Sequence, residues 1–204
     1  MIFLPEIDPN TALIWALVGY LLGSIPSGVL IARVMNLGNL RDIGSGNIGA
    51  TNVLRTGNKK AAALTLFFDA IKGTIAVLAA RYFADDIAAQ IAGIAAMLGH
   101  CFPIWLRFKG GKGVATYFGI IFAIAWPMGI AAAIIWLSVA AISRYSSMAA
   151  LLVAGWLPLV MMFTGFSAYF FLGIVLGLVV YVRHLGNIKR LRDGTETKIG
   201  ANSG

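Results

Sequence analysis

Long apolar runs constrain this chain more than any other feature of its sequence. A helix that crosses about 30 Å of hydrocarbon needs about 20 residues, because it rises about 1.5 Å per residue. Only 12% of the 204 residues are charged, whereas an ordinary soluble domain has about 25%. We therefore predict an all-α integral membrane protein, folded as a single multi-span domain over residues 1–204. The five runs that approach the length of a span are 11–35, 61–84, 87–106, 148–165 and 167–183.

A sixth apolar run, 114–142, allows two interpretations. Pro127 and Gly129 interrupt it near its centre, and a proline removes a backbone donor that a continuous helix needs. The run therefore forms either one long kinked helix or two short helices that fold back on each other.

The distribution of Lys and Arg chooses between these interpretations. The cations gather in three segments, which we call the first basic loop (33–60), the second basic loop (107–113) and the basic tail (183–198). If 114–142 crosses the membrane twice, all three lie on one side, as the positive-inside rule expects of the cytoplasmic face. We therefore predict a seven-helix transmembrane bundle with the N-terminus outside and the C-terminus cytoplasmic. The predicted helices are about 11–35, 61–84, 87–106, 114–126, 128–142, 148–165 and 167–183.

The first basic loop combines glycines, small polar side chains and arginines. Successive amide groups in such a loop can form an anion-binding nest, and an arginine can add paired hydrogen bonds to a phosphate. The glycine spacing also matches the dinucleotide-binding fingerprint, but that fingerprint requires a preceding strand, and an apolar helix precedes it here. A flexible glycine turn is the alternative. The candidate ligands are Gly44, Ser45, Gly46, Asn47, Thr51, Asn52 and Arg55.

The second basic loop places two lysines around a glycine-rich run just before a predicted helix. The N-terminus of a helix favours anions, so this arrangement is typical of a phosphate cradle. It is not a Walker A sequence, because a glycine replaces the required Ser or Thr after the second lysine. A positive-inside anchor with a glycine turn is the alternative. The candidate ligands are Lys109, Gly110, Gly111, Lys112 and Gly113.

Polar residues also occur in and before the basic tail. His184 and Asn187 are three residues apart, so they share one face if the last helix continues. Ser146 and Ser147 lie on the same side as the basic segments only if 114–142 is a hairpin. For the histidine a structural hydrogen bond is the alternative, and for the serines a bond to their own helix backbone.

Two charged residues lie inside an apolar run. Asp69 and Lys72 are three residues apart on one predicted helix. Charges are costly there, so the two either form a structural ion pair or contact substrate in a polar cavity. His100, in another apolar run, is predicted to make a helix–helix hydrogen bond.

Together these segments predict a membrane-level site for anionic, phosphorylated ligands. The net charge of +8 comes from cations that flank apolar runs, which points to membrane lipids and not to nucleic acid. No cluster of Cys, His, Asp or Glu has metal-ligand spacing, so we expect neither a metal nor a cofactor. The alternatives are a transporter or channel for a small organic phosphate and a scaffold subunit.

These residues resemble the bacterial acyl-phosphate-dependent glycerol-3-phosphate acyltransferases (PlsY type). The likeness covers nearly the whole chain in order, and one departure is Ile48, where the family usually has proline. The matching blocks are Gly23–Gly28, Ile43–Arg55, Asp69–Gly73, Leu98–Pro103, Phe108–Thr116 and Arg183–Leu191.

The resemblance implies a seven-helix enzyme of the bacterial inner membrane with a cytoplasmic active site. It implies transfer of a long-chain acyl group from acyl phosphate to the 1-hydroxyl of glycerol 3-phosphate, in the first acylation of phospholipid synthesis. Ser45, Arg55, Lys112 and His184 are then the expected catalytic residues. The expected substrate contacts are Gly44, Gly46, Asn47, Thr51, Asn52, Asp69, Lys72, Lys109, Gly110, Gly111, Gly113, Ser146, Ser147 and Asn187.

Overall fold

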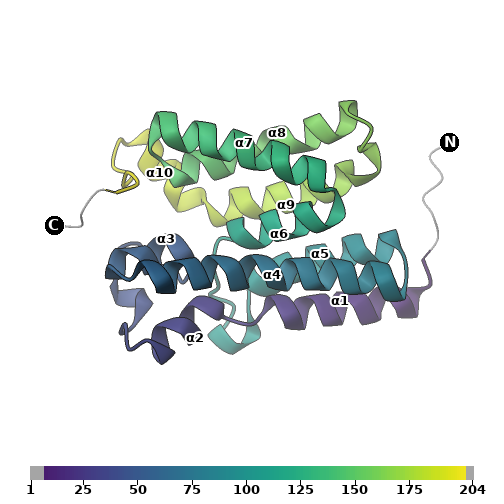
Figure 1. Cartoon of the computed structure of the whole chain (residues 1–204), viewed down its shortest axis with the longest axis horizontal. Coiled ribbons are helices and arrows are strands. Elements are labelled where there is room, and N and C mark those ends of the chain that lie inside the picture. The colour runs from purple at the N-terminus through teal and green to yellow at the C-terminus, as the bar shows by residue number, and fades with distance from the viewer. Residues whose placement is uncertain (1–6, 201–204) are drawn as a thin grey trace.

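The computed structural model describes residues 7–200, and within that range every regular element is a helix (Figure 1). The predicted domain therefore extends at both ends beyond the described residues. Short 3-10 turns join several helices. The α-helices are α1 (Pro9–Gly23), α2 (Ser27–Val34), α3 (Ala50–Val53), α4 (Lys59–Phe83), α5 (Asp86–Cys101), α6 (Val114–Ile124), α7 (Trp126–Ser143), α8 (Ser146–Phe163), α9 (Phe170–Arg183) and α10 (Leu185–Arg192).

The first apolar run, predicted as one helix over about 11–35, holds two helices, although Pro9–Val34 together forms one candidate membrane span. The chain breaks between Gly23 and Ser27, and α2 continues in a new direction. Pro26 explains the break, because it has no N–H to donate and disfavours a helical residue before it. The break leaves the carbonyl of Ile25 free to accept a hydrogen bond from the Lys72 ammonium, 2.9 Å away.

The run 114–142 forms two helices, α6 and α7, which contact each other. The chain turns at Ala125, two residues before Pro127, which then occupies the first turn of α7 where a missing N–H is tolerated. This is the hairpin that the charge distribution favoured. The last predicted span also differs, because a 3-10 turn occupies Ser167–Tyr169 and α9 begins only at Phe170.

Five segments of the described chain are long and apolar enough to cross a membrane, and the bent pair α9 and α10 makes a sixth. The membrane character and the helical class predicted from the sequence are therefore confirmed. Helix α6 has only 11 residues, or about 16 Å at 1.5 Å per residue. A count of seven spans, with the two termini on opposite sides, stays a prediction.

Small residues bring the helices close together. On α1, Gly19 and Gly23 lie against the backbone of Ala92 and Ala96 on α5, so closely that an added Cβ would overlap those residues. Such small-residue contacts are typical of helix pairs in membranes, where dispersion packing replaces the hydrophobic effect. This contact fixes α5, and α5 in turn supports the second basic loop.

The basic segments gather at one end of the bundle. Helices α2, α3 and α10 lie at this end in Figure 1, whereas α1 begins at the opposite end. An Arg41 guanidinium N–H contacts the carbonyl of Lys109, which joins the first and second basic loops. Arg183 at the end of α9 donates to the second basic loop as well. The convergence that the charge pattern predicted is present in the fold.

Candidate functional site

Asn52 organises the first basic loop from inside. Its side chain is buried, and its amide oxygen accepts from the Ser45 N–H at 3.0 Å and the Ser45 hydroxyl at 3.2 Å. Its amide nitrogen donates to the Leu40 carbonyl at 2.9 Å. Asn52 therefore organises the loop and leaves Ser45 exposed at the surface, and its predicted contact with substrate stays a prediction.

Arg55 lies directly over Gly44. A side chain at Gly44 would come within 2.6 Å of the Arg55 guanidinium, and the backbone there has a φ of +52°, which glycine adopts without strain. Gly46 also has a positive φ of +65°, but its N–H donates to Ile43 at 2.9 Å, so this amide does not face a ligand as predicted. The loop therefore places Arg55 beside Ser45 and Gly44. Asn47 is half-buried and Thr51 exposed on the same loop.

The glycines of the second basic loop form a different structure from the one predicted. The N–H of Gly110 donates to the Cys101 carbonyl and the N–H of Gly111 to the His100 carbonyl, each at 3.1 Å. These two amides are therefore unable to cradle a phosphate, and that prediction is corrected. Their carbonyls accept from Arg183, each at 3.0 Å. The end of α5 and Arg183 therefore both hold this turn through hydrogen bonds, and the turn fixes the backbone just before Lys112.

Lys112 comes just before α6 and is followed by the buried Gly113, the N-cap of that helix, which has a φ of +82°. Burial lowers the pKa of Lys112 to about 8, and the nearby Glu196 carboxylate opposes that shift. The positive charges of Arg190, Arg55 and Arg183 lower the pKa further. Residues of the first basic loop and of the basic tail therefore act on an ammonium group of the second basic loop. Lys109, by contrast, is exposed on the same loop.

Glu196 is a residue of this cluster that sequence reasoning missed. Its carboxylate accepts hydrogen bonds from Ser147 at 2.8 Å, Asn187 at 2.5 Å and Arg190 at 2.7 Å. Although partial burial raises the pKa of Glu196, these three hydrogen bonds hold it below its usual value. The available signal was an acidic side chain inside a strongly basic tail.

His184 lies at the bend between α9 and α10 and is buried. Its Nδ1 is 2.8 Å from the Val180 carbonyl. A carbonyl can only accept, so Nδ1 carries the proton and the neutral ring presents Nε2 as an acceptor. Ser146, half-buried at the first turn of α8, and Ser147 begin the neighbouring helix.

Asp69 and Lys72 form a buried ion pair at 2.9 Å, with side chains only 4% and 5% exposed. The structural interpretation of this pair therefore accounts for both charges, and the predicted substrate contact at either residue is not needed to explain them. His100 lies beside Asp69 and below the second basic loop.

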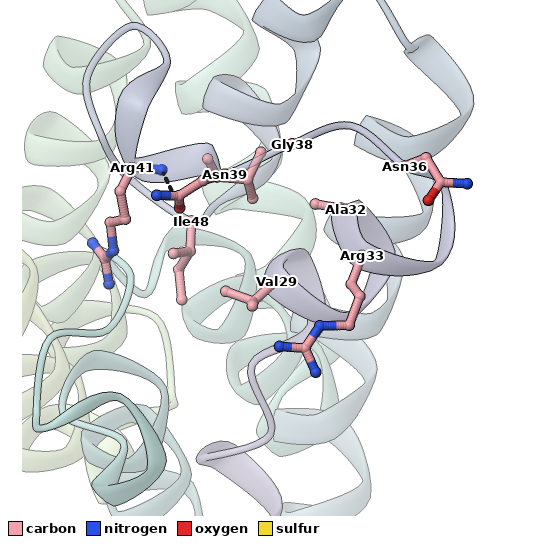
Figure 2. A pocket seen from close by; sticks show the side chains of 9 residues that line it. Val29, Ala32, Arg33, Asn36, Gly38, Asn39, Arg41 and Ile48 are labelled. Atoms are coloured by element: carbon pink, nitrogen blue, oxygen red, sulfur yellow. Dashed lines mark hydrogen bonds between the residues drawn. The ribbon is translucent and has the colours of Figure 1, made fainter.

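A crevice of about 510 Å³ opens beside the first basic loop, between α2 and residues 36–41 (Figure 2). Its inner wall is apolar and includes Val29, Ala32 and Ile48, while Arg33 and Arg41 carry charge near its margins. Within the described residues, no group of His, Cys, Asp and Glu side chains could hold a metal ion.

Comparison with known proteins identifies relatives along nearly the whole chain. A family model described as glycerol-3-phosphate acyltransferase matches residues 13–194. The chain is 58% identical to a glycerol-3-phosphate acyltransferase of Roseobacter denitrificans, over 92% of this chain and 94% of that protein. It is 56% identical to a protein of the same name from Ruegeria pomeroyi, over 94% of both chains.

Two solved structures share the fold. Both are crystal structures of PlsY (YgiH), an integral membrane glycerol 3-phosphate acyltransferase. The glycerol 3-phosphate form superposes with a TM-score of 0.87 at 38% identity, covering 93% of this chain and 96% of the other. The lysophosphatidic acid form gives a TM-score of 0.84 at 36% identity, covering 93% and 95%.

Proposed function

Since this chain belongs to the glycerol-3-phosphate acyltransferase family, we propose that it transfers a long-chain acyl group from acyl phosphate to the 1-hydroxyl of glycerol 3-phosphate. The hydroxyl oxygen attacks the acyl carbon, and the bond from that carbon to the bridging phosphate oxygen breaks. The products are 1-acylglycerol 3-phosphate and inorganic phosphate. Phosphate is a good leaving group, so the reaction needs no covalent enzyme intermediate.

One observation carries this proposal: charged residues of the first basic loop and of the basic tail lie near Lys112 of the second basic loop, at a single end of the bundle. Both substrates and the leaving phosphate are anions, and the reaction develops negative charge on the acyl oxygen. Preorganised cations and N–H groups in a partly dehydrated site stabilise such charge without reorganisation. Lys112 and Arg55 are the cations that we assign to this task.

We assign the two substrates to different parts of the cluster. Ser45, Gly44 and Arg55 form the side that receives acyl phosphate, because the loop presents the hydroxyl and the guanidinium together. His184, Asn187 and the serines of α8 form the side that receives glycerol 3-phosphate. The unprotonated Nε2 of His184 can accept a hydrogen bond from a glycerol hydroxyl and orient it.

The proton of that hydroxyl needs an acceptor. A phosphate oxygen of a substrate is the acceptor that we propose, as the family resemblance suggests, and His184 then orients the hydroxyl. The acyl chain lies in an apolar environment between the helices, surrounded by membrane lipids.

The proposed location follows from the same charges. Cations at one end of the bundle predict that this end is cytoplasmic, so the protein is a multi-pass enzyme of the bacterial inner membrane with its active site facing the cytoplasm. Seven spans with an external N-terminus and a cytoplasmic C-terminus satisfy this arrangement. No nucleic acid and no cofactor take part.

The direct test is an assay of the purified protein in detergent with palmitoyl phosphate and glycerol 3-phosphate. We expect lysophosphatidate and inorganic phosphate in equal amounts, and no product when palmitoyl-CoA replaces palmitoyl phosphate. If a folded preparation releases no lysophosphatidate, the proposed reaction is wrong.

The pKa of Lys112 predicts a specific pH dependence. Because burial lowers that pKa to about 8, kcat/KM should fall by up to about tenfold per pH unit above pH 8, if only the ammonium form binds phosphate. Lys112→Arg should keep its charge and show a flat profile between pH 8 and about 9.5. A wild-type profile without a decline in this range would contradict the assignment of Lys112.

The titration of Lys112 does not itself destabilise the native protein over this pH range. The pKa of Lys112 lies below its usual value of 10.5, so the unfolded chain binds more protons than the native one between pH 8 and 10.5. The contribution of Lys112 to the free energy of unfolding therefore rises with pH over that range. Thermal unfolding measured at each pH separates the two effects.

A further inference from the structure

A buried polar cluster lies under the second basic loop and has no role in the reaction proposed above. Asp69 and Lys72 come from α4 and His100 from α5, and their side chains are 4–5% exposed. Lys72 lies 2.9 Å from Asp69 Oδ1 and donates to the Ile25 carbonyl at 2.9 Å. His100 Nδ1 lies 3.5 Å from the same carboxylate oxygen. Ionisable groups inside a helix bundle are costly, so their presence calls for a function.

Charge balance does not require the histidine. Lys72 alone neutralises the Asp69 carboxylate, and a third polar side chain in this place adds a desolvation cost. What distinguishes His100 is the contact on its other side, with the second basic loop.

The imidazole ring of His100 packs directly against Gly111. An added Cβ at Gly111 would overlap Nε2 of His100 and lie 2.8 Å from its Cε1, so only a glycine fits over the ring. The Gly111 N–H also donates to the His100 carbonyl at 3.1 Å. One residue of α5 therefore contacts Gly111 through both its side chain and its backbone, immediately before Lys112.

Helix α6 is held to the same cluster. The Thr116 hydroxyl donates to the carbonyl of Asp69 at 2.7 Å, and Thr116 is fully buried. Lys112 therefore lies in the chain between Gly111, which packs against His100, and Thr116, which donates to the Asp69 backbone. A shift in the His100 ring would move the loop relative to α6.

We propose that His100 is a positioning residue: its buried ring, which faces Asp69, sets the position of Gly111, and Gly111 sets the position of the Lys112 ammonium. His100 does not touch substrate in this mechanism. The kinetic part of the proposal rests on the function proposed above, whereas the structural part concerns the loop alone.

The experiment measures hydrogen–deuterium exchange of peptides spanning 107–113 in the full-length protein, for wild type and His100→Gln. Glutamine keeps a polar group near Asp69 but has no ring to support Gly111. We expect exchange in the loop at least about tenfold faster, a local opening easier by about 1.4 kcal/mol. We also expect KM for palmitoyl phosphate or glycerol 3-phosphate to rise at least about fivefold.

Arg81→Gln is the matched control. Arg81 donates to Asp86 at 3.0 Å and to the Ala123 carbonyl at 2.8 Å, far from the basic loops. Its loss should lower the melting temperature and leave both exchange in 107–113 and KM at wild-type values.

Gly111→Ala tests the same contact from the loop and leaves the buried charges intact, so it also serves if His100→Gln does not fold. We expect faster exchange in 107–113 and a loss of kcat/KM of at least about tenfold. Unchanged exchange in a folded variant overturns the proposal, and so does faster exchange with an unchanged KM. If the wild-type protein has no turnover, the proposed function fails, whereas the exchange result still decides whether His100 supports the loop.

Discussion

Replacing Lys112 by alanine is expected to lower kcat/KM at least about tenfold, a loss of about 1.4 kcal/mol of transition-state stabilisation. The ammonium lies near charged residues of both the first basic loop and the basic tail. Its removal leaves substrate phosphate and the developing oxyanion without their nearest cation on the second basic loop. Steady-state release of phosphate from palmitoyl phosphate, with glycerol 3-phosphate as acceptor, measures the effect.

Arg55→Ala should lose at least about tenfold by the same reasoning, because Arg55 is the cation that the first basic loop holds over Gly44. Lys59→Ala is the control for both. Lys59 is an exposed cation at the start of α4, at the same end of the bundle, so its loss tests whether net charge alone matters. Wild-type rates in both Lys112→Ala and Arg55→Ala would contradict our assignment of the catalytic cations.

Replacing Glu196 by alanine is expected to lower both activity and stability. The carboxylate accepts from three donors that come from α8 and α10, and a buried donor that loses its acceptor costs roughly 1–3 kcal/mol. Ser147 and Asn187 would lose the group that orients them towards the cluster. We expect a lower melting temperature and a loss of kcat/KM of at least about tenfold.

Glu196→Gln and Asp193→Ala separate the causes. Glutamine keeps one oxygen, which can still accept from Ser147 and Asn187, but it loses the acceptor for Arg190 and the charge. It should therefore recover stability more fully than activity. Asp193 is an exposed acid on the same tail, and its removal should change neither measurement. If Glu196→Ala melts and turns over like the wild type, the tail carboxylate does not organise the site.

The sequence was sufficient where local composition decides the outcome. Apolar runs of membrane length predicted helices, because in lipid a helix satisfies its own backbone groups. The placement of Lys and Arg predicted that 114–142 folds as two helices, and α6 and α7 do so. It also predicted that the basic loops and the tail gather at one end, which the contact of Arg41 with Lys109 and those of Arg183 with the second basic loop bear out.

Predictions from the sequence were wrong where a backbone N–H group has more than one possible hydrogen-bond acceptor. A glycine-rich basic loop predicted that the amides of Gly110 and Gly111 face a phosphate, but they donate to the end of α5. That partner is about ten residues away along the chain, and only the path of the loop brings it within reach. Asn52 is a similar case, since its buried side chain donates to Leu40 within the loop, a role that the sequence did not predict.

The amino-acid sequence by itself thus determined the helical class, the membrane character and the residue types available for binding anions. Periodicity, length and charge are local properties, and each can be read without knowing which helices touch. The tertiary structure alone decided which of the candidate groups remain free for a ligand. That outcome depends on pairings across tens of residues, such as Glu196 with Ser147 or Arg183 with Gly110, and close packing selects these pairings only when the whole bundle forms.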